Sequence, residues 1–287
     1  MRATDCPPTL TDTQVLDFCK AGFLMLPGVV DAETNARVVA WCARNPRHEP
    51  SDLLGEEWFV EGVLLQAEAA GAVRSLLGQN FRLPLIVSNH RLELPCSAQS
   101  WHRDGGSIYG PEVNYLQVFY YPEACPPEKA PTELLPGSHF LFSHAPWMGH
   151  YNAVRGAVLS EAPAGSIFLT AYNIWHRRSA SAPEATGVRN LLKYNYWRTA
   201  TPQRDWLTEP GFDLETADYS SPWTPTFREQ FRECFDAAEM FCWLCGRQDE
   251  YRRLGGQGWP MPASSYEWYG IRERPGYPFG PAGREST

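Results

Sequence analysis

Gln99-Ser100-Trp101-His102-Arg103-Asp104-Gly105-Gly106 is the stretch around which the rest of the chain is organised. It contains a histidine and a carboxylate two positions apart. On a β-strand that spacing places both side chains on one face, so His102 and Asp104 can reach the same metal ion. Two ligands do not make a site, and His176, in Tyr172-Asn173-Ile174-Trp175-His176-Arg177, is the best candidate for a third. The stretch therefore predicts a metal site that a residue far along the chain completes.

The chemistry of this ligand set narrows the choice of metal. Two histidines and one carboxylate on one face of an octahedral ion are the arrangement of non-haem Fe(II) oxygenases. This arrangement leaves three coordination positions open for a cosubstrate and O2. We therefore expect His102, Asp104 and His176 to bind Fe(II).

The pattern of hydrophobic residues changes to a period of two from about residue 85. Strands are expected over 85–94, 113–121, 166–171 and 188–197, separated by turns that contain Gly and Pro. Several short strands of this kind favour a β-sandwich or jelly roll over a parallel α/β sheet.

Helical patterns flank these strands. Thr11-Asp12-Thr13-Gln14 has the form of a capping box, before a helix that ends at Gly22. Asp31 is expected to cap a second helix, and a third is expected over about 61–77. We expect one domain over 1–287 in three parts, which are a helical scaffold (11–84), the strands with the metal site (85–198) and an aromatic, Pro-rich extension with a helix over 227–247 (199–287). The extension is expected to be a lid or a homodimer interface.

The composition limits the partners of this protein. A net charge of −8 argues against nucleic acid as a partner. No run of 18 apolar residues is present, so no membrane span is expected. The eight scattered cysteines and the absence of a signal sequence favour a reducing, cytoplasmic location. Cys242 and Cys245 are interpreted as helix packing residues, because no second pair or nearby histidine would complete a zinc site.

The order of these features resembles the phytanoyl-CoA dioxygenase family of Fe(II)- and 2-oxoglutarate-dependent oxygenases. The resemblance covers about residues 11–198 and rests on four motifs in order. They are Phe18-x-x-x-Gly22-Phe23-Leu24-Met25-Leu26-Pro27, the His-x-Asp of Trp101-His102-Arg103-Asp104, the turn Pro136-Gly137-Ser138-His139, and Trp175-His176-Arg177 followed by Arg189. The Pro-rich segment 122–131 departs from the family pattern beside the site.

The resemblance implies a mainly β fold with flanking helices around a double-stranded β-helix (jelly roll, cupin-like) core. It also implies that Arg189 pairs with the distal carboxylate of 2-oxoglutarate, a fixed bidentate contact for which arginine is suited. Arg177 and Arg178 are the competing candidates. Further cosubstrate contacts are expected from Gln117, Ser88 and Gln99.

The expected activity is oxidation of an unactivated C–H bond of a small organic molecule by Fe(II), 2-oxoglutarate and O2. Hydroxylation, desaturation and cyclisation are all compatible with it, and tailoring of a secondary metabolite is the favoured setting. Halogenation is disfavoured, because related halogenases lack the carboxylate that Asp104 supplies. Two alternatives stay open. One is a metal-dependent jelly-roll isomerase or lyase that does not use 2-oxoglutarate, and the other is a non-catalytic small-molecule binding protein.

Overall fold

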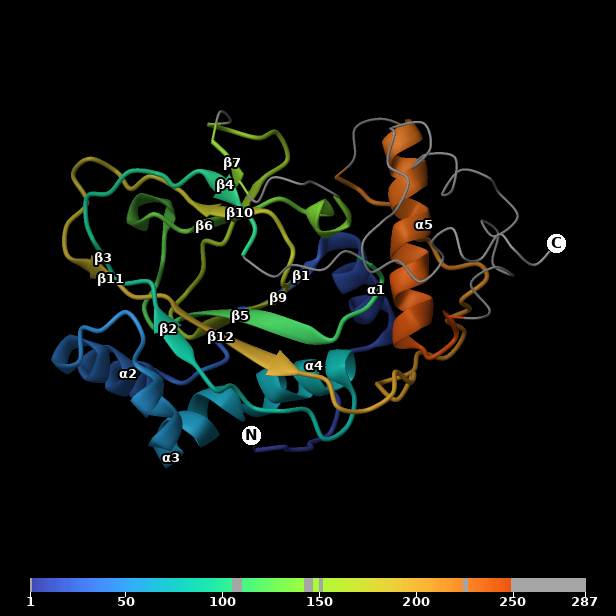
Figure 1. Cartoon of the computed structure of the whole chain (residues 1–287), viewed down its shortest axis with the longest axis horizontal. Coiled ribbons are helices and arrows are strands. Elements are labelled where there is room, and N and C mark those ends of the chain that lie inside the picture. The colour runs from blue at the N-terminus through green and yellow to red at the C-terminus, as the bar shows by residue number, and fades with distance from the viewer. Residues whose placement is uncertain (1, 105–109, 142–146, 150–151, 224–226, 249–287) are drawn as a thin grey trace.

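Two antiparallel β-sheets lie one above the other in the computed structural model (Figure 1), which describes residues 2–104, 110–141, 147–149, 152–223 and 227–248. The first sheet has the order β1 (Phe23–Leu26), β9 (Ser166–Ala171), β5 (Tyr115–Tyr121), β12 (Leu192–Trp197) and β2 (Val87–Asn89). The second has the order β7 (Trp147–Met148), β4 (Trp101–His102), β10 (His176–Arg178), β6 (Thr132–Leu134) and β8 (Val158–Leu159). A short pair, β11 (Val188–Arg189) with β3 (Leu92–Glu93), lies at one edge. The expected mainly β fold with a jelly-roll core is confirmed.

Alternation along β5 divides the hydrophobic core in two. Leu116, Val118 and Tyr120 belong to the larger cluster, which they share with residues of the helices below the first sheet. Phe119 and Tyr121 point the other way, into a smaller cluster with residues of β6 and β9. Because successive side chains of a strand lie on opposite faces, one strand supplies both cores. The smaller core lies between the two sheets, where the candidate site is found.

The first two helices begin where the sequence predicts. The capping box at the start of α1 (Asp12–Ala21) is present in both directions, between Thr11 and Gln14. Gly22 closes this helix in the left-handed conformation, at φ +79°. Asp31 caps α2 (Ala32–Arg44) by accepting from the backbone N–H of Thr34.

The third predicted helix, over 61–77, is wrong in its beginning and in its continuity. The chain forms α3 (Glu57–Phe59), a π-helical turn (Val60–Leu64) and then α4 (Ala67–Leu77). The side chain of Gln66 accepts from the N–H of Ala69 and starts α4 as a new helix. The hydroxyl of Tyr196 donates to the carbonyl of Leu64 at 2.8 Å and so satisfies the end of the turn before it. Short 3-10 turns occur at Ser51–Gly55, Pro127–Lys129 and Ser138–Phe140.

Two predicted strands are interrupted at matching points. The range 85–94 divides into β2 and β3, and the range 188–197 divides into β11 and β12. The two segments, 85–94 and 188–197, stay paired through the break, because the N–H of His90 donates to the carbonyl of Leu191 at 2.8 Å. The side chains of Asn89 and Asn190 also bond there, at 3.0 Å. The two paired segments therefore leave the first sheet together, and the corner at Asn89 and Asn190 separates β2 and β12 from the pair β3 and β11.

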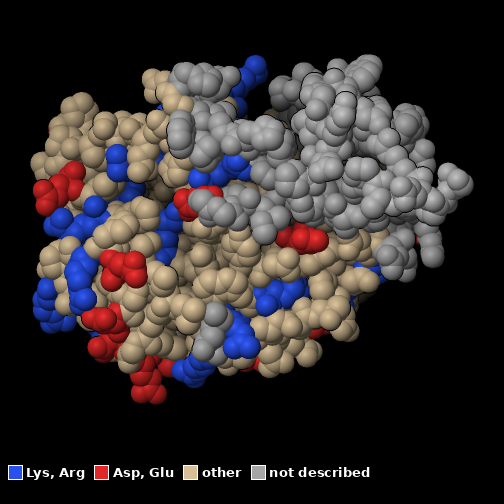
Figure 2. All heavy atoms as spheres, in the orientation of Figure 1, with Lys and Arg blue, Asp and Glu red and all other residues tan. Residues whose placement is uncertain are grey.

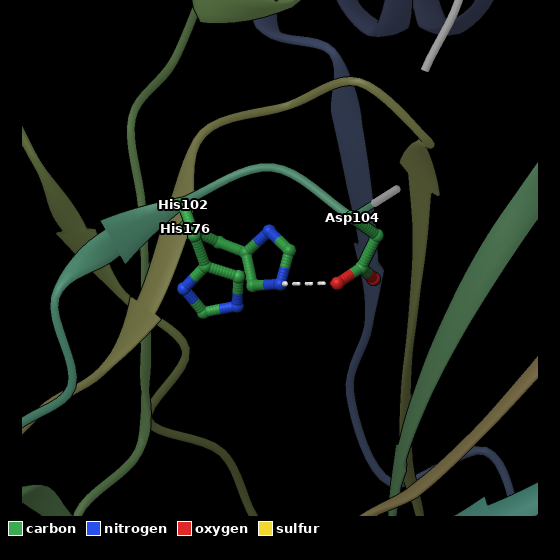
Figure 3. A group of neighbouring side chains, drawn as sticks. All are labelled: His102, Asp104 and His176. Atoms are coloured by element: carbon green, nitrogen blue, oxygen red, sulfur yellow. Dashed lines mark ion pairs between the residues drawn. The ribbon is translucent and has the colours of Figure 1, made fainter. Parts of the chain in front are cut away.

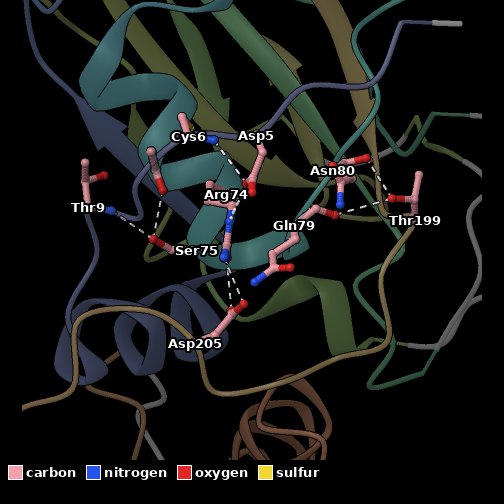
Figure 4. A network of polar contacts seen from close by, with 10 residues as sticks. Asp5, Cys6, Thr9, Arg74, Ser75, Gln79, Asn80, Thr199 and Asp205 are labelled. Atoms are coloured by element: carbon pink, nitrogen blue, oxygen red, sulfur yellow. Dashed lines mark hydrogen bonds and ion pairs between the residues drawn. The ribbon is translucent and has the colours of Figure 1, made fainter.

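The described part of the C-terminal extension packs on the N-terminal helices. Helix α5 (Phe227–Leu244) contacts α1, and Phe241 lies in the same hydrophobic cluster as Phe18. Polar contacts add to this packing (Figure 4), since Arg74 of α4 pairs with Asp5 on one side and with Asp205 on the other. These contacts join residues 199–205 to the helical side of the fold.

Charges are mixed on the one face of the molecule that Figure 2 shows, where acidic and basic side chains intermingle. Among the described residues, no helix combines the length and the apolar character that a membrane span requires.

We predict that Asp12→Asn lowers the free energy of unfolding by about 3 kcal/mol, because it breaks a buried ion pair. Asp12 is fully buried, and its carboxylate accepts from Arg204 at 2.6 and 2.7 Å, from the indole of Trp206 and from the N–H of Glu209. Urea denaturation measures the change. The matched control is Asp52→Asn, since Asp52 pairs with Arg47 at the same 2.6 Å but is 68% exposed, and its loss should cost at most about 1 kcal/mol.

The effect of Asp12 should depend on pH. Burial raises the pKa of Asp12, but the hydrogen bonds from Arg204, Glu209 and Trp206 outweigh it and hold the pKa below its usual value. A carboxyl with a lowered pKa in the folded state stabilises the fold above its unfolded pKa of about 3.9. The difference between the wild type and Asp12→Asn should therefore be full at neutral pH and shrink below about pH 4. A difference that is constant with pH would contradict this account.

Candidate metal centre

The three predicted ligands lie together at the edge of the smaller core (Figure 3). His102 on β4 and His176 on β10 are direct register partners, so their side chains project from the same face of the sheet. Asp104 was expected on the same strand as His102, but β4 ends at His102; Asp104 follows it by two residues and still points toward the same space. One ligand atom from each residue lies within 4.8 Å of the others, and Nε2 of His176 is 3.8 Å from Oδ1 of Asp104.

Backbone carbonyls fix the orientation of both imidazoles. Nδ1 of His102 is 2.9 Å from the carbonyl of Ser100, and Nδ1 of His176 is 3.1 Å from that of Ile174. Each Nδ1 must carry the proton to donate to a carbonyl, which leaves the lone pair on Nε2 for a metal. Burial, followed by the charge of Lys193, lowers the pKa of His176 to about 3. The ring is therefore neutral at physiological pH, the state that binds a metal.

One atom shows that these residues fit a metal. Nε2 of His176 is buried and has no hydrogen-bond partner among the described residues. A buried polar atom without a partner costs free energy, and such atoms are rare in folded proteins. A metal ion between His176, Asp104 and His102 would satisfy it.

Lys193 and Gln117 hold the carboxylate of Asp104. Nζ of Lys193 donates to Oδ2 at 2.7 Å, and Nε2 of Gln117 donates to the same oxygen at 2.5 Å. Burial raises the pKa of Asp104, but the charges of Lys193 and His176 and the two hydrogen bonds bring it below its usual value. Asp104 is therefore ionised and oriented.

The turn over 136–139 positions β10. The hydroxyl of Ser138 accepts from the N–H of Trp175, directly before His176. Nε2 of His139 lies 3.0 Å from the carbonyl of Cys19 at the end of α1. A Cβ at Gly22 would lie 2.4 Å from the ring of His139, and its backbone has a positive φ, so only glycine fits there. Helix α1, the turn over 136–139 and strand β10, which carries His176, thus form one connected unit.

A pocket of about 260 Å³ lies beside the two histidines. No aspartate or glutamate is found among its described lining residues, and most of its polar lining is cationic or imidazole. These side chains are His48, His90, Arg91, His102, His176, Arg178, Arg189 and Lys193. Such a lining favours an anionic ligand.

The residues predicted to contact a cosubstrate fall into three groups. Arg189 lines the pocket, and its Nη atoms donate to the carbonyls of Ala130 and His90. Its buried Nε has no hydrogen-bond partner in the part of the chain that the structure describes. Gln99 lines the pocket and is exposed. Gln117 and Ser88 do not line the pocket: Gln117 contacts Asp104, and Ser88 donates weakly to the carbonyl of Lys193 at 3.5 Å.

The two competing arginines separate by strand alternation. Arg177 pairs with Glu133 at 2.8 Å and lies over the ring of Trp101, away from the pocket. Arg178 lines the pocket on the same face of β10 as His176. Of the two arginines, Arg178 is therefore the one whose side chain lines the pocket.

The prediction of site residues omitted Lys193. The signal was present in the sequence, because Arg189, Leu191 and Lys193 alternate on one face and all three line the pocket. A lysine in a strand is more often at the surface, and only the position of Asp104 on the facing sheet makes its burial understandable.

The fold is shared with solved structures of metalloenzymes. No family model and no curated protein matches the chain. The epimerase SnoN, in complex with Fe3+, alpha ketoglutarate and nogalamycin RO, is similar at a TM-score of 0.52 and 18% identity, over 65% of this chain and 83% of SnoN. HygX from Streptomyces hygroscopicus, with nickel and 2-oxoglutarate bound, is similar at 0.53 and 19%, over 74% and 94%.

A third structure extends the range of activities found on this fold. The non-heme alpha ketoglutarate-dependent carbocyclase SnoK from nogalamycin biosynthesis is similar at a TM-score of 0.51 and 17% identity, over 70% of this chain and 90% of SnoK. At these identities the likeness shows the fold. None of the three structures is described as a member of the phytanoyl-CoA dioxygenase family, so the resemblance to that family stays a prediction.

We predict that the wild type binds one Co(II), used as a stand-in for Fe(II), and that His176→Ala weakens binding at least about 100-fold, because a three-residue ligand set loses a member. Calorimetric titration of metal-free protein measures both. His48→Ala is the control, since His48 lines the same pocket outside the ligand set. Equal affinity in His176→Ala and the wild type would rule out the assigned ligands.

Proposed function

We propose that this chain is an Fe(II)- and 2-oxoglutarate-dependent dioxygenase that oxidises an unactivated C–H bond of a small organic molecule. One observation carries the proposal. His102 and His176 are brought into register beside Asp104, and the pocket next to them has a cationic lining. The ligand set suits Fe(II), and the lining suits a dicarboxylate.

His102, Asp104 and His176 would hold the metal on one face. In His102 and His176, the contact of Nδ1 with a backbone carbonyl keeps each imidazole in the tautomer that binds a metal through Nε2. Together, bound iron and 2-oxoglutarate would supply the oxidation of the substrate by O2.

Arg189 would bind the distal carboxylate of the cosubstrate. Arg189 lines the pocket, two backbone carbonyls orient its guanidinium, and its buried Nε has no hydrogen-bond partner among the described residues. A guanidinium has five N–H donors, so donors beyond those two bonds stay available for a carboxylate. Thr132 and Gln99 add neutral polar lining to the same pocket.

The substrate would approach from the opposite end of the inward face of β5. Along this face Phe119 lines the cationic pocket, Gln117 contacts Asp104, and Tyr115 follows about 7 Å further on. Tyr115 lies edge to face with Tyr172, at 4.8 Å between ring centroids, beside a small hollow of about 70 Å³. These two rings would form one aromatic wall beside an organic substrate.

The class of reaction follows from the ligand set and stays broad. Because Asp104 supplies a carboxylate, we favour hydroxylation, desaturation or ring formation over halogenation. SnoN is an epimerase and SnoK a carbocyclase, so the shared fold supports several outcomes of this chemistry. Both come from nogalamycin biosynthesis, which supports tailoring of a secondary metabolite as the setting for this chain.

The deciding experiment is an anaerobic titration of metal-free protein with Fe(II) and then with 2-oxoglutarate, followed by visible absorption. The wild type should develop a weak metal-to-ligand charge-transfer band when the 2-oxo acid chelates the iron. Arg189→Met should need at least about tenfold more 2-oxoglutarate to reach the same band, because a charge-assisted contact of about 1.5–3 kcal/mol is lost. Its affinity for Fe(II) should stay that of the wild type.

Two other results would favour the alternatives. If iron binds and no band develops, a metal-dependent isomerase or lyase without 2-oxoglutarate replaces the proposal. If neither iron nor 2-oxoglutarate binds, a non-catalytic small-molecule binding protein is the better account.

A further inference from the structure

We infer that Lys193 and Gln117 restrict Asp104 to binding the metal through one oxygen, which keeps a coordination position open for the 2-oxo acid. This inference rests on the proposed function. It assigns to Lys193 and Gln117 the role of positioning residues that act through Asp104.

Both donors converge on a single oxygen. Lys193 Nζ lies 2.7 Å and Gln117 Nε2 lies 2.5 Å from Oδ2 of Asp104. The other oxygen, Oδ1, is the one that faces the imidazoles, 3.8 Å from Nε2 of His176. The carboxylate is therefore turned with Oδ1 toward the metal position and Oδ2 toward the first sheet.

The two donors come from neighbouring strands with a fixed register. Lys193 of β12 pairs with Phe119 of β5, and Asn195 pairs with Gln117. Lys193 and Gln117 are thus diagonal neighbours on one face of the sheet, a distance that long side chains can span. Because both strands lie inside the first sheet, the positions of the two donors are set by the ladder of backbone hydrogen bonds.

Lys193 is committed to this contact. Its side chain is 9% exposed and packs over the ring of Phe119, with Nζ 4.9 Å from the centroid. Asp104 is its one ion-pair partner among the described residues. A buried ammonium needs a close and well-oriented partner to repay its lost hydration. Movement of Asp104 away from Lys193 would therefore be costly.

Neutralisation of charge alone does not explain the arrangement. A lysine placed near either oxygen would balance the charge of Asp104 equally well. Gln117 is uncharged, contributes no neutralisation, and still donates to the same oxygen as Lys193. The feature that the two donors share is the oxygen that they select, and this feature determines which oxygen is left to face the metal.

The consequence concerns the number of open positions. A carboxylate can bind a metal through one oxygen or through both. Three protein ligand atoms leave three positions of an octahedral ion open, two for a chelating 2-oxo acid and one for O2. If Asp104 bound through both oxygens, it would take one of these positions from the cosubstrate.

The test compares metal affinity with cosubstrate affinity in matched variants. For wild type, Lys193→Met, Lys193→Arg and Gln117→Leu, calorimetry measures the Kd of Co(II) and then the Kd of 2-oxoglutarate for the Co(II)-loaded protein. Lys193→Met should bind Co(II) no more weakly than the wild type, because the second oxygen of Asp104 becomes available to the metal, but should bind 2-oxoglutarate about tenfold or more weakly, because that oxygen occupies a position the 2-oxo acid needs. Gln117→Leu should show the same split with no change of charge, and Lys193→Arg should restore 2-oxoglutarate binding.

Water bound to the metal gives a readout that does not depend on the cosubstrate. With Mn(II) loaded in place of Fe(II), water-proton relaxation should report fewer water ligands in Lys193→Met and in Gln117→Leu than in the wild type, because the second carboxylate oxygen replaces one. If Lys193→Met does not fold, as judged by circular dichroism, Gln117→Leu decides the question by itself.

Three results would overturn the inference. Loss of Co(II) and 2-oxoglutarate affinity in the same proportion would show a merely structural role. Loss of 2-oxoglutarate binding in Lys193→Met but not in Gln117→Leu would show that only the charge matters. Variants that bind both as the wild type does would show that Asp104 needs no such restraint. In these cases the proposed function stands, whereas a wild type that binds no metal removes both.

Discussion

The pairing of β4 with β10 is the constraint on which the site depends. Where His102 faces His176 across this ladder, two imidazoles from distant parts of the chain are held on one face, and their ring centroids lie 4.5 Å apart. The other face of the same strands is closed by Arg177, which pairs with Glu133 of β6 and lies over Trp101. One face of the sheet therefore carries ligands with available lone pairs, while the other carries a satisfied ion pair.

One end of the jelly-roll interior contains charged side chains, and there Asp104 pairs with Lys193. Asp104 comes from the second sheet, and Lys193 and Gln117 come from the first. Their hydrogen bonds to Asp104 cross the gap between the sheets, stabilise its charge and fix the orientation of its carboxylate. Phe119 of the smaller core lies next to this contact, with its ring centroid 4.9 Å from Nζ of Lys193.

The helical side of the protein supports the site at a distance. The ring of His139 occupies the space left by Gly22 at the end of α1, and the next link, from Ser138 to the N–H of Trp175, leads directly to His176. The described part of the C-terminal extension packs on this same helix and is joined to it through the buried Asp12. Described residues of the extension thus help to bury α1, and α1 in turn contacts the turn over 136–139 through His139.

Local sequence determined the features that depend on neighbouring residues. Capping by Thr11 and Asp31, the end of α1 at Gly22 and the alternation along β5 could all be predicted, because each follows from backbone geometry over a few positions. Tertiary structure decided the rest. Where the helix predicted over 61–77 is interrupted, the carbonyl of Leu64 accepts from Tyr196, and at the corner Asn89 bonds to Asn190; both partners lie about a hundred or more positions away. The burial of Lys193 likewise depends on Asp104 of the facing sheet, since no local pattern specifies which carboxylate a strand will meet across a core.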